Sequence, residues 1–114
     1  MELNELLTHI QQRPQSITFS DVIATIDEHY LFTPTAFTNG DIHNAVNQNN
    51  GSCKIFAFAL LHQLSLESTL ACFGDFYRQD VLEYPHNNDH QNIRNFMRYG
   101  WQGIHFSAQA LQLR

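Results

Sequence analysis

The sequence predicts an α+β fold, with about five helices packed round a central apolar helix, a β-hairpin and one further short strand. Apolar residues recur at helical spacing in several segments that turn signals separate. The run Ile55 to Leu61 is apolar on nearly every side, which is typical of a helix enclosed by others. Asn39-Gly40 indicates a hairpin, because a type I′ turn needs positive φ at both central residues.

The first two helices have recognisable limits. The first carries an apolar stripe from Leu3 to Ile10, and Pro14 ends it. The second is expected to begin at a Ser20 cap and to continue its stripe to Tyr30. A proline at position 34 then disfavours helical geometry in the residue before it.

The later helices follow the same logic. Ser52 is expected to cap the central helix, which runs to about Gln63, and Ser65 to cap the next. The segment RQDVLEYP is expected to form a shorter helical piece that a proline stops. A last helix is expected to start at a cap on Asn88 or Asp89 and to end near a glycine, Gly100.

The hairpin register follows from the expected two-residue turn. Phe37 would lie opposite Ile42 on the core face, because side chains alternate along a strand. The segment Trp101 to Ala108 is expected to be a short strand that pairs with this hairpin. The polar face of the hairpin would then carry Ala36, Thr38, Asp41 and His43.

Composition excludes several classes of protein. The 114 residues suit one domain spanning 1–114, and the formal net charge of −5 with scattered basic residues argues against nucleic-acid or anionic-membrane binding. No apolar run approaches the roughly 18 residues of a membrane span, and the N-terminus lacks the pattern of a cleaved export signal. Two cysteines in apolar helical surroundings indicate free thiols, so we expect a cytoplasmic protein without cofactors.

Four stretches resemble those of a known family. They are FTPTAFTNG, HNAVNQNNGSCKIFAFA, TLACFGDFYRQDVL and DHQNIRNFMRYGW. The chain resembles the HopJ family of type III effector-like proteins from about Phe19 to Phe106, nearly the whole of a single HopJ-like domain. The resemblance implies a bacterial protein, with possible delivery to a host cell by type III secretion. It implies no agreed biochemical activity, so no catalytic role is carried over from it.

Cys53 is the candidate nucleophile. If Ser52 is the cap, Cys53 opens the helix, where unpartnered amides and the helix dipole lower the pKa of a thiol below its usual ~8.5. His43 and His90 are candidate bases. The competing interpretation is a small buried apolar residue, which is also our interpretation of Cys72.

Asparagines dominate two loops, before the central helix and before the last helix. If these loops meet, they form an uncharged hydrogen-bonding cleft beside Cys53 that suits a peptide or a small polar ligand. The histidines of HNNDH have a spacing that binds metal on a helix, but here they lie in a loop, so we expect no metal site. The candidate ligand-binding residues are Asn44, Asn50, Ser52, Asp89 and Arg94.

Two function classes follow. The first is a non-catalytic protein of undetermined biochemical activity that acts by binding a protein partner, which the absence of a complete catalytic motif favours. The alternative is a small thiol-dependent hydrolase or transferase with Cys53 as its nucleophile.

Overall fold

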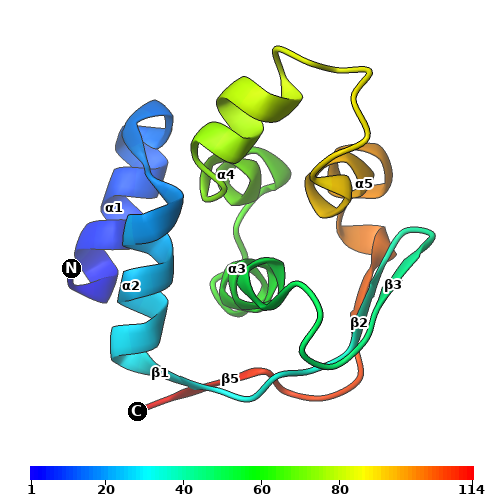
Figure 1. Cartoon of the computed structure of the whole chain (residues 1–114). Helices are drawn as coiled ribbons and strands as arrows, with labels where there is room; N and C mark the ends of the chain where they lie inside the picture. Colours follow the sequence, from blue (N-terminus) through cyan, green and yellow to red (C-terminus); the bar gives the residue numbers. More distant parts are fainter.

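A central helix organises the molecule, as the sequence predicts. The computed structural model describes all 114 residues, and its α+β architecture confirms the predicted fold class. Figure 1 shows α3 viewed nearly along its axis, with α1 and α2 on one side of it and α5 on the other. The α-helices are α1 (Leu3–Gln12), α2 (Phe19–His29), α3 (Asn50–Leu61), α4 (Leu66–Ala71) and α5 (Gln91–Tyr99).

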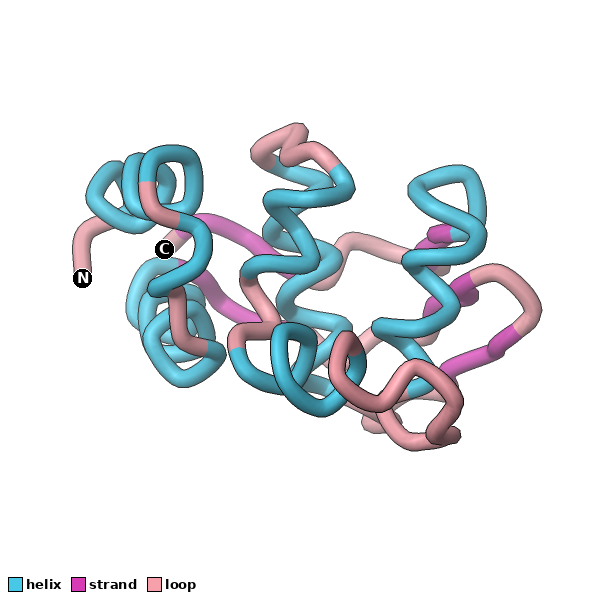
Figure 2. Tube along the Cα trace, turned by 90° about the horizontal axis from the view of Figure 1, so that it is seen from above, coloured by secondary structure: helices cyan, strands magenta, loops and turns pink.

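The strands form two small antiparallel sheets. In the first, β1 (Tyr30–Phe32) pairs with β5 (Leu111–Leu113). In the second, β2 (Phe37–Asn39) lies between β3 (Ile42–Asn44) and β4 (Ile104–Phe106). Figure 2 shows the two groups of strands at separate ends of the molecule, with both chain termini near the first. The pairing of β4 with the hairpin confirms that the segment Trp101 to Ala108 pairs with it, but only Ile104–Phe106 is a strand and Trp101 lies in a short helical segment before it.

Three shorter helical segments complete the chain: η1 (Pro14–Ser16), η2 (Phe76–Val81) and η3 (Gly100–Gly103). The segment η2 has π-helical hydrogen bonding, a rare geometry that is frequent at functional sites. It follows Gly74, whose φ of +60° breaks the chain away from α4. None of the helices is both long and apolar enough to cross a membrane.

The core is rich in aromatic rings, as the nine phenylalanines indicate. Phe56 of α3 is fully buried, and its ring lies 5.0 Å from that of Phe96 and 5.4 Å from that of Phe73. Phe37 of β2 lies 5.9 Å from the same ring. One side chain of α3 therefore joins the hairpin, α5 and the segment after α4, which fixes the elements around the central helix.

The predicted hairpin register is wrong by two residues, because the turn lies one residue later in the chain. Phe37 pairs with Asn44 and Asn39 pairs with Ile42, so the turn residues are Gly40 and Asp41. Asn39 belongs to the strand and is fully buried. The physical reason is tertiary: its side-chain amide donates to the backbone carbonyl of Asn92 at 2.8 Å, a partner that a position in the turn would not give.

Three predicted helix caps are also wrong. Thr18, rather than Ser20, caps α2 with its side chain, and Asn49, rather than Ser52, is the N-cap of α3. The N-cap of α5 is His90, not Asn88 or Asp89. In contrast, Ser65 caps α4 by accepting from the Ser68 amide at 3.1 Å, as expected.

The first sheet was not anticipated from the sequence. Tyr30 follows the helical stripe of α2, but the helix ends at His29 and Tyr30 begins β1. Its partner strand lies near the C-terminus, where Tyr30 pairs with Leu113. A pairing between residues so distant in the chain leaves no local signal.

Candidate functional site

A pocket of about 380 Å³ lies where the starts of α3 and α5 meet the segments around η2. One part of its wall is apolar and aromatic, and the other is polar and comes from two helix starts. Its lining residues are Phe19, Ile42, Asn49, Gly51, Ser52, Phe73, Phe76, His90, Gln91, Asn92 and Ile93.

The aromatic wall comes from three elements. Phe19 opens α2 and its ring meets that of Phe76, the first residue of η2, edge to face at 5.0 Å. Phe73 is almost fully buried, whereas Phe76 keeps 40% of its surface exposed. The wall is held in place by Arg78, whose guanidinium donates to the backbone carbonyls of Pro14 at 3.2 Å and of Ile17 at 2.5 Å.

The polar wall comes from the first turns of α3 and α5. Their N-caps, Asn49 and His90, have left-handed backbone conformations with φ of 57° and 50°. Neither side chain caps its own helix. The first amides of a helix have no acceptor within the helix, so both turns bring unused N–H donors to this region.

At the inner side of the pocket, asparagine side chains, most of them buried, tie the two helix starts to the hairpin. Asn92 of α5 and Asn44 of β3 exchange side-chain hydrogen bonds at 3.0 and 3.1 Å. Asn49 donates to the Asn44 side chain at 2.8 Å, and Asn95 donates to the Asn39 carbonyl at 2.7 Å. The two asparagine-rich regions therefore meet, which the sequence analysis gave only as a condition, but part of their contact is buried and Cys53 does not line the pocket beside it.

Asn39 has the one buried side-chain polar atom without a hydrogen-bond partner, its Oδ1. Its Nδ2 donates to both the backbone carbonyl and the Oδ1 of Asn92. A flipped amide would bring two carbonyl oxygens together at that position, so the observed orientation is the favourable one. The Oδ1 has no donor because the Nδ2 of the same side chain is turned toward Asn92 at the start of α5.

His90 is the candidate base that lies at the pocket. Its Nε2 is 3.0 Å from the Asp80 carboxylate, and its ring lies 5.1 Å from that of Phe76. These contacts orient the imidazole towards η2. The other candidate base, His43, is exposed on the opposite face of the hairpin from Asn44 and lies beside Thr38.

Cys53 lies one turn inside α3 and not at its start. Its backbone N–H donates to the Asn49 carbonyl at 3.0 Å, so its amide is already paired. The side chain is fully buried and hydrogen-bonds through Sγ to the Thr35 carbonyl at 3.5 Å, and to neither candidate base. The expected lowering of its pKa is wrong: burial raises the pKa of the Cys53 thiol, and Lys54 opposes this only partly.

The structure separates the five candidate ligand-binding residues. Ser52 lines the pocket, and Asn44 lies behind it in the buried amide cluster. Asn50, by contrast, bonds outward to Asn47. Asp89 and Arg94 bind each other at 2.7 Å outside the pocket, and this hydrogen bond is the main cause of the lowered pKa of Asp89.

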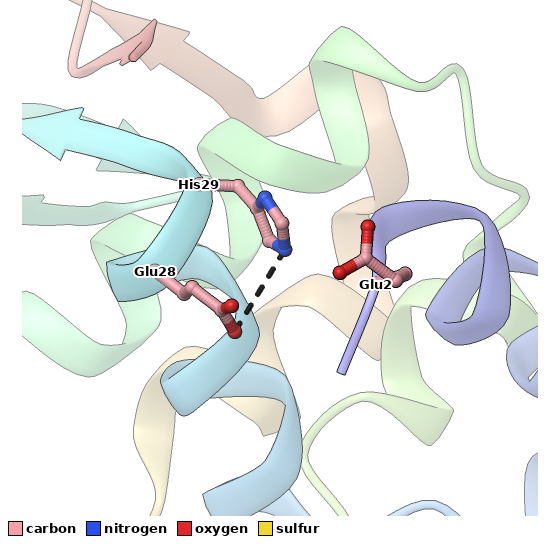
Figure 3. Close-up of side chains that lie close together, drawn as sticks. All are labelled: Glu2, Glu28 and His29. Atoms are coloured by element: carbon pink, nitrogen blue, oxygen red, sulfur yellow. Dashed lines mark ion pairs between the residues drawn. The ribbon is translucent and has the colours of Figure 1, made fainter.

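A cluster of two carboxylates and a histidine lies where α1 begins and α2 ends. Figure 3 shows Glu2, at the N-cap of α1, near Glu28 and His29 at the end of α2. Their ligand atoms lie within 4.8 Å of one another. The α-amino group of Met1 lies 3.4 Å from Glu28, and the Met1 carbonyl lies 3.0 Å from His29 Nε2. These contacts already use the charge of Glu28 and the ring nitrogen of His29, so the cluster is accounted for without an ion.

Sequence reasoning missed most of the pocket wall. The sequence analysis gave no functional role to Phe19, Phe73 or Phe76, since an aromatic residue near helical spacing is usually core. Gln91 and Ile93 belong to a helix start that was placed earlier in the chain. The left-handed N-caps carry a weak local signal, since asparagine tolerates this conformation better than most residues.

Comparisons with known proteins agree with the resemblance noted in the sequence. No curated protein matches the chain. A crystal structure described as that of unknown function protein VPA0580 is 57% identical, with a TM-score of 0.99, and the match covers 100% of this chain and 95% of that one. The family model described as HopJ type III effector protein matches residues 3–111. The chain therefore belongs to the HopJ family.

Proposed function

We propose that this protein acts by binding a protein partner, and that the pocket between α3 and α5 receives a side chain of that partner. The observation that carries the proposal is the convergence of unusual backbone on one pocket. Two left-handed N-caps, Asn49 and His90, and a π-helical segment all contribute to its wall. Such backbone costs roughly 1–3 kcal/mol per residue and clusters at ligand-binding sites.

The size and lining of the pocket suit one side chain better than a large cofactor. Its volume of about 380 Å³ lies at the lower end of the range for ligand pockets. The aromatic wall offers apolar contact, while Ser52, Gln91 and the helix-start amides offer hydrogen bonds. A partner residue with an apolar body and a polar end matches both.

The buried amide cluster supports the proposal through preorganisation. Asn92 and Asn95 fix the start of α5 against the hairpin, and the bond from Asn49 to Asn44 fixes the start of α3, before any ligand arrives. Binding to a rigid pocket loses less conformational entropy than binding to a mobile one. Direct involvement of the candidate residue Ser52, and of His90 as a polar contact, is part of this proposal.

Membership of the HopJ family bears on where the partner is met. The family is described as one of type III effector proteins. This description supports a partner inside a host cell, with the protein in the bacterial cytoplasm before it is delivered.

A peptide-selection experiment tests the proposal. Random peptides displayed on phage are selected on the immobilised protein, and the enriched peptides are synthesised for fluorescence-anisotropy titration. We expect Ser52→Trp, which fills the pocket, to weaken binding by at least about tenfold. Gln102→Trp, an exposed position on η3, is the matched control and should leave Kd unchanged. Enriched peptides that bind both variants equally would refute the pocket.

The alternative of a thiol-dependent hydrolase or transferase gains no support from the geometry around Cys53. The sulfur is buried, its pKa is raised, and it does not line the pocket. This function would require a conformational change that exposes the sulfur to a base. The labelling rates in the Discussion test that requirement.

A further inference from the structure

A second concave surface lies on the outer side of α5. It is a groove of about 290 Å³ between α5 and the end of η2. Figure 1 shows the yellow loop that returns to α5, and Pro85 of this loop lines the groove. We call it the arginine groove, and its lining residues are Val81, Leu82, Pro85, Arg94, Met97 and Arg98.

The groove has an apolar floor that is partly open to water. Leu82 keeps 49% of its surface exposed and Met97 keeps 40%, whereas Val81 is buried beneath them. Covering such a surface is favourable, because apolar area leaves water. Methionine adds adaptability, since its unbranched side chain can repack against differently shaped partners.

Two arginines carry the charge of the groove. They are four residues apart on α5, so they share one helix face. Part of the hydrogen-bonding capacity of Arg94 is already used, because its Nε and Nη2 donate to Asp89. Arg98 makes no ion pair within the chain, and its guanidinium lies 5.3 Å from the ring centre of Tyr99.

None of the carboxylates around the groove forms an ion pair with Arg98. The charge of Arg98 contributes to the lowered pKa of Asp41, whose oxygens bond to Asn95 at 2.7 Å and to Tyr99 at 3.4 Å. Asp80 lies 3.0 Å from His90, and Asp89 pairs with Arg94. In a chain with a net charge of −5, this groove thus retains an unpaired cation beside exposed apolar surface.

We infer that the arginine groove docks a segment of a protein partner that places an apolar side chain over Leu82 and Met97 and an aspartate or glutamate against Arg98. The inference rests on the proposed function, because it names the chemistry of the same class of partner. Guanidinium groups favour carboxylates for geometric reasons, since their parallel N–H groups match the two oxygens. The ion pair with Arg98 selects an acidic residue in the partner, and the apolar floor provides the contact area.

The peptides selected on the intact protein supply the probe for this inference. We expect them to be enriched in Asp or Glu next to Leu, Met or Phe. Their Kd should rise about tenfold with Arg98→Gln and with Met97→Ser, and should rise as salt is added. Arg13→Gln removes an exposed arginine elsewhere in the chain and should leave the Kd unchanged. Met97→Ser alters a partly exposed side chain, and circular dichroism confirms that each variant is folded.

The outcomes separate this inference from the pocket proposal. Peptides that lose binding with Ser52→Trp but not with Arg98→Gln overturn the groove and leave the pocket. Peptides that respond only to Arg98→Gln support the groove and contradict the pocket. The inference is overturned if the selected peptides are not enriched in Asp or Glu. It is also overturned if selection on the Arg98→Gln variant enriches the same peptides equally.

Discussion

At Cys53, two effects on the acidity of the thiol oppose one another, and their relative sizes decide which form of the sulfur is present. The helix dipole and Lys54 favour the thiolate. Burial of the side chain disfavours it, and burial is the larger effect, so the pKa is raised. The dipole contributes little because Cys53 lies beyond the unpaired amides, with its own N–H bonded to Asn49.

Labelling with iodoacetamide measures this balance. Burial also raises the pKa of Cys72, to about 12, so both thiols should react slowly in the native protein at neutral pH. Both should react rapidly once the chain is unfolded in guanidinium. The rate is followed by mass spectrometry on wild type and on Cys72→Ala, in which only Cys53 remains.

Native Cys53 that labels as fast as the unfolded thiol would contradict the buried assignment. It would also revive the thiol-enzyme hypothesis, since fast labelling requires an accessible thiolate. Native rates that match those of Cys72 would instead support a packing role for both cysteines.

The junction between α4 and η2 shows how one residue positions an element. Gly74 has a φ of +60°, and a Cβ at this position would lie 2.8 Å from the backbone nitrogen of Phe19. The close approach brings Phe73, Phe76 and the start of α2 together, and these form the aromatic wall of the pocket. Gly74 is therefore both a break between α4 and η2 and a point of close contact with α2.

Replacing Gly74 by alanine should therefore be costly. The left-handed backbone alone costs an L-residue about 1–2 kcal/mol, and the contact with the α2 backbone adds to this. The free energy of unfolding, measured by urea denaturation, is expected to fall by more than ~2 kcal/mol in Gly74→Ala. A loss no larger than the ~1–2 kcal/mol of the left-handed backbone itself would show that the approach to Phe19 is not tight.

Across the whole molecule, His62 links the end of the central helix to the first sheet. Its Nε2 lies 2.7 Å from the Tyr30 hydroxyl, and its ring lies 4.6 Å from that of Phe58. Burial in these surroundings lowers the pKa of His62 below its ordinary value of 6.5. The folded state therefore favours the neutral imidazole.

This lowered pKa makes global stability depend on pH. Since the unfolded chain takes up the proton first, the contribution of His62 is complete above pH 6.5 and is lost as the pH falls through its lower folded-state pKa. The free energy of unfolding should decline between about pH 7 and about pH 5. The shifts at Asp41 and Asp89 act only near and below 3.8, the ordinary pKa of the carboxyl group.

The variant His62→Gln isolates the histidine from the other titrating groups. Its loss of stability over the same pH range should be smaller than that of wild type, in urea denaturations at each pH. An identical decline in both proteins would exclude His62 as the cause. A steeper decline in the variant would reverse the sign of the proposed linkage.

Local sequence determined what depends on neighbouring residues. The helical spacing of apolar residues gave α1 and the enclosed α3, and Ser65 and Gly100 marked helix ends that the structure confirms. The strings around Asn49 and His90 carried the family likeness. These features rest on interactions within one or two turns of chain, which a sequence pattern records directly.

Only the tertiary structure decided the hairpin register, the start of α3 and the pocket. Asn39 is a good turn residue by itself, but Asn92 and Asn95 offer it buried hydrogen bonds from 53 and 56 residues away. Those bonds place it in the strand, because an amide paired in the core outweighs a local preference for a turn. Ser52 likewise loses its role as a cap when Asn49 bonds to Asn44, and this shift carries Cys53 into the helix. The pocket follows from the same long-range contacts, which no single segment encodes.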